Sequence, residues 1–138
     1  MICDGVHIHP ASVRTTFKIF GDGRIILISD SMRATGLEDG DYTLGGQDVK
    51  VTGNRAALHD GTIAGSVTNL LDCMRTAVLK MGIPLESAVK CAAVNSAKSI
   101  GIYDRHGSIT PGKIADVVLL KKDGLKLQRV ILNGKPLP

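Results

Sequence analysis

Residues 25–30 constrain the fold of this chain more than any other part of the sequence. Four consecutive apolar residues, 25–28, are followed by Ser29 and by a carboxylate at Asp30. A strand that is apolar on both sides is typical of a parallel sheet covered on both faces. Such sheets and barrels carry their chemistry at the carboxyl ends of the strands. The sequence therefore predicts a buried strand over 25–30 and makes Asp30 the first candidate for a catalytic residue.

Length and composition predict one compact unit and argue against several classes of partner. The chain has 138 residues, 43% of them hydrophobic, and a formal net charge of +4. Its basic residues are scattered and its aromatic content is only 3%, so we expect no nucleic-acid partner. No run approaches the ~20 apolar residues of a membrane span, and no leader pattern opens the chain. We expect a soluble, cytoplasmic protein, and its charge is compatible with a small anionic substrate.

The three cysteines indicate a reduced protein. Cys3, Cys73 and Cys91 are odd in number and far apart, without a Cys-x-x-Cys pair. This usage fits buried thiols better than a disulfide scaffold.

Apolar periodicity and glycine positions predict the order of helices and strands. The expected helices cover residues 11–20, 66–82, 84–93 and 96–100. The expected strands cover residues 25–30, a meander of short antiparallel segments between 42 and 58, and residues 117–120 and 130–132. This order suits an α/β core with a separate small sheet. Its helices are too few for a closed (β/α)8 barrel, which needs about 250 residues, so the chain is expected to be part of something larger.

Four blocks of the sequence resemble the N-acetylglucosamine-6-phosphate deacetylases, in the order of that family and at about its spacing. The blocks are DGVHIHP at residues 4–10, SDSMRATGL at 29–37, DGDYTLGG at 39–46 and TIAGS at 62–66. The tail from Asn95 to Asp116 resembles a closing segment shared by many amidohydrolases. The resemblance extends over essentially the whole chain and corresponds to the C-terminal third of the family's proteins.

This resemblance implies the C-terminal part of a (β/α)8 metal-dependent hydrolase barrel, together with strands of a small β-sandwich. Residues 1–40 would form a barrel segment with the end of strand seven, a helix, strand eight and the following loop. Residues 41–60 would be a sandwich insertion, residues 61–105 barrel-associated helices, and residues 106–138 the C-terminal sandwich strands. The implied reaction, in amino-sugar catabolism, hydrolyses the N-acetyl group of N-acetylglucosamine 6-phosphate to glucosamine 6-phosphate and acetate.

The resemblance gives Asp30 the role of a proton shuttle. Amide hydrolysis requires an activated water and a proton for the departing amine, and a carboxylate can remove the first proton and return it to nitrogen. The alternative for Asp30 is a helix cap or turn carboxylate, because Asp followed by Ser often begins a turn.

Substrate contacts carried over from the family fall on His7, Ile63, Ala64 and Gly65. His7 and His9 alternate as two metal ligands on a strand would, but the family has such a pair after another strand, so only His7 receives a role. Ser66 is expected to cap the helix that follows residues 63–65, and a helix start can bind an anion. Arg33 is interpreted as a solvent-facing loop charge, with phosphate contact as the alternative, and His59 and His106 as surface residues.

The family uses a divalent metal, zinc or iron, whose glutamate and histidine ligands come from earlier barrel strands and have no counterparts in this chain. We therefore expect no metal site in this chain and no activity of the chain alone. The expected partners are a phosphorylated amino sugar and, in the full-length family, a second subunit of a homodimer. Two alternatives remain: part of another amidohydrolase of the dihydroorotase or adenine deaminase type, and a noncatalytic association module.

Overall fold

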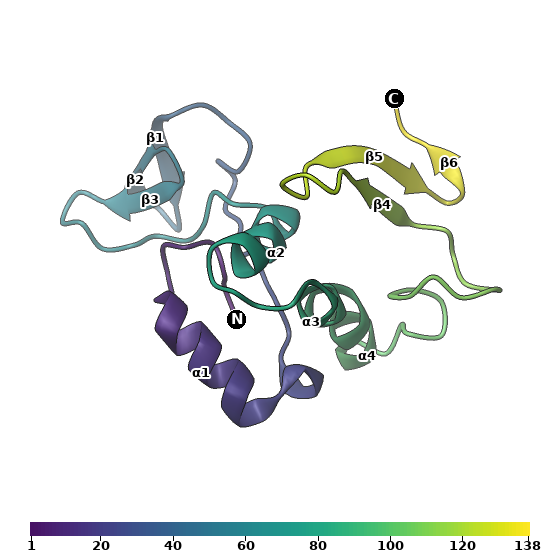
Figure 1. Cartoon of the computed structure of the whole chain (residues 1–138). Coiled ribbons are helices and arrows are strands. Elements are labelled where there is room, and N and C mark those ends of the chain that lie inside the picture. The colour runs from purple at the N-terminus through teal and green to yellow at the C-terminus, as the bar shows by residue number, and fades with distance from the viewer.

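The computed structural model describes all 138 residues, as a central group of helices between two separate three-stranded sheets (Figure 1). The helices are α1 (Pro10–Phe20), α2 (Leu70–Leu79), α3 (Leu85–Val89) and α4 (Asn95–Ser99), with a 3-10 turn at Asp22–Arg24 and a π-helical turn at Lys90–Val94. The strands are β1 (Gly40–Leu44), β2 (Gln47–Thr52), β3 (Arg55–Leu58), β4 (Val117–Leu120), β5 (Leu127–Leu132) and β6 (Lys135–Pro136). Both sheets are antiparallel.

The main core lies among the helices and the segment that leads to Asp30. Its ten buried members come from α1, α2, the α3 region and two nearly extended segments near residues 3 and 25–27. All three cysteines are free and fully buried, as the sequence predicted. Burial also raises the pKa of each thiol to about 11, because a thiolate is poorly solvated there. The complete core list is Cys3, Val13, Ile25, Leu27, Met74, Ala77, Met81, Ile83, Ala88 and Cys91.

Residues 25–30 form an extended segment, but the expectation of burial on both sides is wrong. Ile25 and Leu27 are buried, whereas Ile28 is 48% exposed. The segment pairs with its neighbour only through an isolated parallel bridge between Ile2 and Ile28. One side therefore packs on the helices, while nothing within these 138 residues covers the other side. A parallel sheet needs further strands and helices for that, and both sheets here are small and antiparallel.

Asn95 anchors the beginning of this segment to α4. Its buried side-chain amide donates hydrogen bonds to the backbone carbonyls of Asp22 and Ile25, both at 2.7 Å. Leu27 N–H also donates to the carbonyl of Cys91 at 3.1 Å. These contacts use polar groups that would otherwise be buried without partners, so they define the path of the chain toward Asp30.

The helices differ from expectation at two boundaries. α2 begins at Leu70, and its cap is Asn69, whose side chain accepts from Asp72 N–H. Ser66 is not a helix cap, because it forms a parallel bridge with Ser31. The expected third and fourth helices, residues 84–93 and 96–100, form one continuous helical stretch from Leu85 to Ser99, because the π-helical turn joins them without a break.

The first sheet, β1–β2–β3, confirms the predicted meander and carries a second small core. Val49 and Val51 of β2 are buried against Met32 and Ala34 of the loop that follows Asp30. Ala56 of β3 completes the buried group, and Ala64 and Val67 pack against it. The alternation of side chains along β2 therefore holds the loop after Asp30 on one face of this sheet.

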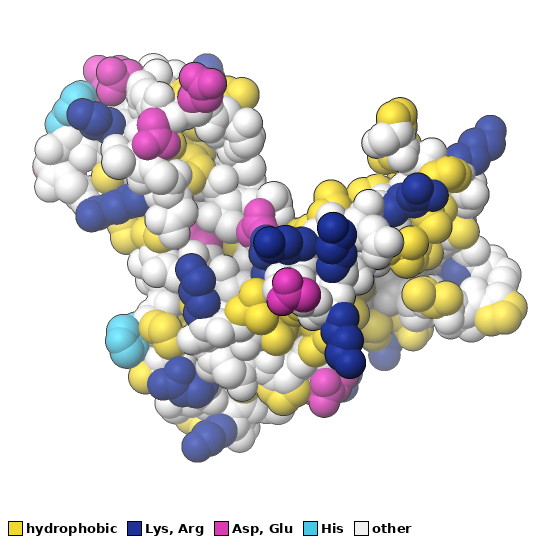
Figure 2. All heavy atoms as spheres, turned by 45° about the horizontal axis from the view of Figure 1, so that its top comes forward, with side chains coloured by type: hydrophobic (Ala, Val, Ile, Leu, Met, Phe, Trp, Pro, Cys, Tyr) yellow, Lys and Arg dark blue, Asp and Glu magenta, His cyan; other side chains and the backbone are white.

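The second sheet, β4–β5–β6, confirms the predicted C-terminal strands and the turn at Asn133 and Gly134. Arg75 of α2 donates to the carbonyl of Gly124 in the β4–β5 turn at 3.1 Å. Large apolar side chains remain exposed on these strands and appear as yellow surface on the right-hand lobe of Figure 2. The exposed apolar side chains on these strands are Val118, Leu119, Leu127 and Leu132.

No helix in the structure has the length and apolarity needed to cross a bilayer.

Candidate active site

The structure brings the two N-terminal blocks together at one end of two parallel segments. Ile2 and Ile28 are bridge partners, so the chain reaches Asp4 and Asp30 two residues after the same bridge. In extended segments, residues two apart point to the same side. Asp4 and Asp30 therefore follow the bridge in matching positions, although their environments differ: Asp4 is buried and Asp30 is exposed.

Asp4 and His7 form a hydrogen-bonded pair within one tight turn. His7 Nδ1 lies 2.7 Å from Asp4 Oδ2, and the Asp4 side chain is completely buried while the His7 side chain is 17% exposed. The other carboxylate oxygen, Oδ1, accepts from the backbone N–H groups of Val6 and His7 at 2.9 and 3.0 Å. Burial by itself raises the pKa of Asp4, but these three hydrogen bonds outweigh it and lower the pKa below its ordinary value.

Asp30 has a backbone conformation that few residues other than glycine adopt. Its φ is +56°, in the left-handed region, where aspartate is tolerated better than most residues. Its side chain is free of hydrogen bonds and ion pairs with the rest of the protein. The alternative of a helix cap does not apply, because no helix begins there. An exposed, strained carboxylate at the end of an extended segment is compatible with a functional role.

Ser66 ties the Asp30 segment to the block at residues 62–66. Its backbone N–H donates to the carbonyl of Asp30 at 2.9 Å, and its carbonyl accepts from Met32 N–H at 2.8 Å. The Thr35 hydroxyl donates to the same carbonyl at 3.2 Å, and the Ser31 hydroxyl donates to the carbonyl of Thr68 at 2.9 Å. Ser66 is 1% exposed, so this connection is shielded from water.

The predicted substrate residues Ile63, Ala64 and Gly65 lie between β3 and Asp30. Ile63 forms an antiparallel bridge with Ala57, and Ala64 N–H donates to the carbonyl of Ala56 at 3.0 Å. Gly65 has a φ of +76°, and a Cβ at this position would lie 3.7 Å from the Asp30 carbonyl oxygen. The structure therefore brings Gly65 close to the backbone of Asp30. Because α2 begins only at Leu70, the expected anion-binding helix start at this block is wrong.

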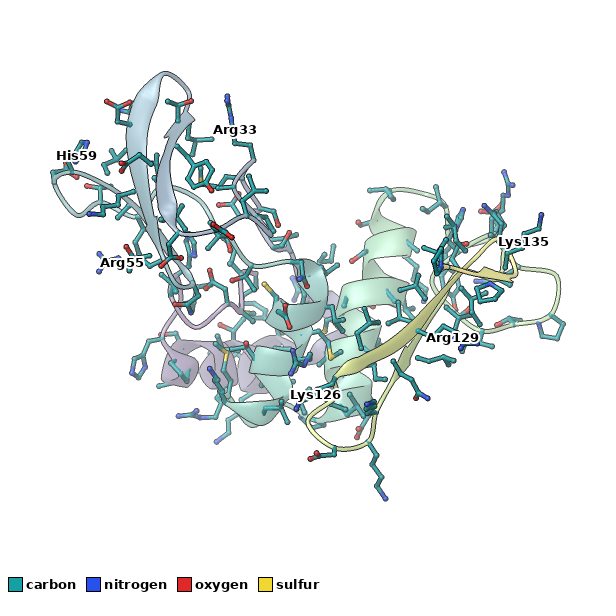
Figure 3. The ribbon with its side chains drawn as sticks, turned by 90° about the horizontal axis from the view of Figure 1, so that it is seen from above. Arg33, Arg55, His59, Lys126, Arg129 and Lys135 are labelled. Atoms are coloured by element: carbon teal, nitrogen blue, oxygen red, sulfur yellow. The ribbon has the colours of Figure 1, made fainter.

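The remaining histidines and Arg33 have separate environments. His9 caps α1, because its Nδ1 accepts from Ala11 N–H at 3.2 Å. His59 is exposed as expected, whereas His106 is half-buried beside Asp116. Figure 3 shows Arg33 projecting away from the protein, and its side chain is exposed as expected.

Two open grooves lie near the site but are lined by other residues. One, of about 370 Å³, runs between the β2–β3 turn and α2 and reaches Asp4. The other, of about 430 Å³, lies on the first sheet beside the basic residues Lys50, Arg55 and His59. Asp30, His7 and Gly65 line neither groove.

Sequence reasoning missed two contributors to this arrangement. Asp4 received no role from the sequence, although an aspartate directly before a glycine favours a turn in which its side chain accepts backbone hydrogen bonds. Ser66 had been assigned to a helix cap. Its contacts with Asp30 join residues 36 positions apart, and no local pattern in the sequence indicates such a pairing.

Comparison with known proteins places the chain in one family. The amidohydrolase family pattern matches residues 1–137. The chain therefore belongs to the amidohydrolase family. It is 42% identical over 123 residues to the N-acetylglucosamine-6-phosphate deacetylase of Bacillus subtilis, which covers 89% of this chain and 31% of that protein.

A shorter relative and a solved structure extend the comparison. The chain is 35% identical over 135 residues to the putative N-acetylgalactosamine-6-phosphate deacetylase of Escherichia coli K12, covering 98% of this chain and 80% of that protein. Its fold matches a mutant N-acetyl-D-glucosamine-6-phosphate deacetylase from Mycobacterium smegmatis, solved in complex with N-acetyl-D-glucosamine-6-phosphate, with a TM-score of 0.90 and 37% identity. That match covers 99% of this chain and 36% of the solved chain. The chain thus spans about a third of the length of the first curated relatives it matches.

Proposed function

We propose that this chain supplies the acid-base and sugar-binding part of an enzyme that hydrolyses the N-acetyl group of N-acetylglucosamine 6-phosphate. The observation that carries the proposal is the hydrogen bond from Ser66 to Asp30, which joins two segments separated in the sequence. Both segments belong to blocks that resemble the deacetylases. The relatives named above are deacetylases of phosphorylated amino sugars, which supports the same substrate class here.

In the proposed reaction Asp30 acts as base and then as acid. Its carboxylate takes a proton from the water that attacks the acetamide carbonyl. The tetrahedral intermediate then collapses with cleavage of the C–N bond, and Asp30 returns the proton to the departing nitrogen. The products are acetate and glucosamine 6-phosphate. An exposed carboxylate without an internal partner is free to make both transfers, whereas a buried carboxylate in an ion pair is not.

The same proposal assigns His7 and residues 63–65 to the substrate. The His7 ring can hydrogen-bond a sugar hydroxyl or a phosphate oxygen, depending on its protonation. Gly65 is assigned to the substrate because a residue without a side chain lets a ligand come close to its backbone. Ile63 is partly exposed beside it and offers apolar surface to the sugar ring.

The family implies a divalent metal, and the residues of this chain do not fit one. No three histidine, cysteine, aspartate or glutamate side chains lie together as a metal site would require. His9 uses its Nδ1 as a helix cap, and His7 Nδ1 is paired with Asp4. We propose that zinc or iron is held by residues outside this chain, and that the assembled enzyme is a cytoplasmic homodimer.

A chimera tests the proposal. In the Bacillus subtilis deacetylase, the matching 123-residue segment is exchanged for that of this chain, and acetate release from N-acetylglucosamine 6-phosphate is measured. We expect activity, and we expect Asp30→Asn to lower kcat by about 100-fold or more, since general acid-base catalysis contributes that much. Exposed Asp48, changed to Asn, is the matched control. An active Asp30→Asn chimera would contradict the assigned role.

A second substrate deserves the same assay because of the Escherichia coli relative. That protein is described as acting on the galactosamine epimer, and this chain covers 80% of its length. The chimera is therefore assayed with both N-acetylglucosamine 6-phosphate and N-acetylgalactosamine 6-phosphate. A preference for the galactosamine epimer would change the proposed substrate but leave the proposed reaction the same.

A further inference from the structure

We infer that Asp4 is a positioning residue for His7, which it holds in the tautomer that carries its proton on Nδ1 and leaves Nε2 as an acceptor for a hydroxyl group of the sugar phosphate. This inference rests on the proposed function for the identity of the ligand, but the tautomer follows from contacts inside this chain. The family resemblance assigned no role to Asp4.

The two carboxylate oxygens of Asp4 have different hydrogen-bond partners, and this leaves only one arrangement for the His7 ring. Oδ1 accepts from the backbone N–H groups of Val6 and His7, and both of these donors are fixed by the turn. Oδ2 is thereby left for His7 Nδ1, at 2.7 Å. An ionised carboxylate can only accept, so Nδ1 must carry the hydrogen of this bond. The lowered pKa of Asp4 agrees with a carboxylate that remains ionised.

The second ring nitrogen is unoccupied by protein groups. His7 Nε2 makes no hydrogen bond within the chain, although its ring is only 17% exposed and is therefore largely held in place. Histidines that bind ligands through one nitrogen commonly donate the other N–H to a carboxylate, which fixes tautomer and orientation. His9 is different, because its Nδ1 accepts a backbone hydrogen bond and no carboxylate faces it. The structure thus separates a ligand-ready histidine from a structural one two residues away.

The Asp4→Asn variant tests the inference because it changes little besides the direction of one hydrogen bond. The asparagine oxygen can keep both backbone donors, while its amide takes the place of Oδ2 and donates to the ring. His7 must then accept at Nδ1, and its proton moves to Nε2. Two-bond ¹H–¹⁵N spectra of the ¹⁵N-labelled 138-residue chain, recorded at alkaline pH where histidine rings are neutral, distinguish the two tautomers.

We expect His7 of the unchanged chain to be protonated on Nδ1 and that of Asp4→Asn on Nε2. Asp116→Asn is the matched control, because it changes the other aspartate that faces a histidine: His106 lies 3.5 Å from its carboxylate, and both side chains are about one-third exposed. His7 has no contact with Asp116, so its tautomer should not respond. A His7 with its proton on Nε2 in the unchanged chain overturns the inference. This measurement needs no variant, so it decides the question even if Asp4→Asn does not fold.

The chimera separates this inference from the proposed function. There we expect Asp4→Asn to raise KM about tenfold, the effect of losing one hydrogen bond to substrate, with little change in kcat. An equal fall in kcat at unchanged KM overturns the positioning role toward substrate. An inactive parent chimera contradicts the proposed function, while the tautomer of His7 in the 138-residue chain still decides the role of Asp4.

Discussion

The backbone N–H of Ser66 donates to the carbonyl oxygen of Asp30 at 2.9 Å, and this bond fixes the point at which the extended segment passes into the loop after Asp30. Asp30 has a φ of +56° there, and the 1% exposure of Ser66 keeps water from competing for the bond. Because a buried hydrogen bond is costly to leave unmade, Ser66 can hold Asp30 in a conformation that its own backbone disfavours.

Replacing Asp30 should reveal the strain at this position. Asp30→Gly is expected to raise the free energy of unfolding by about 0.5 kcal/mol, because glycine adopts positive φ without a steric cost. Asp30→Ala should lower it by about 1 kcal/mol, because alanine has a Cβ and no polar side chain to compensate. Urea denaturation of the 138-residue chain measures both. Equal stabilities of the two variants would show that the positive φ carries no strain.

Gly107 should be the glycine least tolerant of a side chain. An added Cβ would lie 2.7 Å from Ala97 Cβ and 3.0 Å from the carbonyl oxygen of Ala93, at a φ of +86°. Overpacking and backbone strain together should cost about 3 kcal/mol in Gly107→Ala. Gly112→Ala is the matched control: its φ is +91°, but no atom lies within 4 Å, so only about 1 kcal/mol is expected. Thermal and urea unfolding compare the two, and equal losses would argue against close packing at Gly107.

Acid should destabilise the chain through Asp4. A carboxyl with a lowered pKa in the folded state stabilises that state above its unfolded pKa, and this contribution is lost as the pH falls through the folded pKa. Stability should therefore decrease as the pH drops below 3.8, the ordinary pKa of an aspartate. Asp22 and Asp60 have lowered pKa values and contribute in the same direction.

Asp4→Asn should reduce this acid dependence, since asparagine does not titrate. It should also lower stability at neutral pH by about 1–3 kcal/mol, because the charge-assisted bond to His7 is replaced by a neutral one. Chemical denaturation at a series of acidic pH values provides the measurement, with Asp48→Asn as the exposed control. An acid dependence unchanged in Asp4→Asn would assign the effect to other carboxyls.

The three thiols should be unreactive in the folded chain. Each cysteine is fully buried and has its pKa raised to about 11 by burial, so the thiolate that attacks alkylating reagents is scarce and inaccessible. Iodoacetamide at mildly alkaline pH should modify none of them in the native chain and all of them in denaturant, as counted by mass spectrometry. Rapid modification of Cys91 in the native chain would mean that the π-helical turn opens readily.

Local patterns determined most of the elements. The periodicity of α1, the alternation and glycines of β1–β3, and the turn at Asn133 and Gly134 are short-range features, so the sequence alone predicted them. The position of Asp30 at the end of an apolar segment was equally visible. The blocks of residues around Asp30 and Gly65 led to the right family, because the residues of a motif and their spacing can be read from the sequence alone.

Only the tertiary structure decided which of these residues meet. Ser66 has a good helix-capping side chain, yet its backbone pairs with the segment at Asp30 and Ser31. Helix α2 begins only after Asn69, which is its cap. Asp4 could have been a turn residue in solvent, but packing buries it and makes His7 its partner. Ile28 is apolar and still exposed. Burial and long-range hydrogen bonds depend on how distant segments pack, and a local pattern constrains what a segment can form without choosing its neighbours.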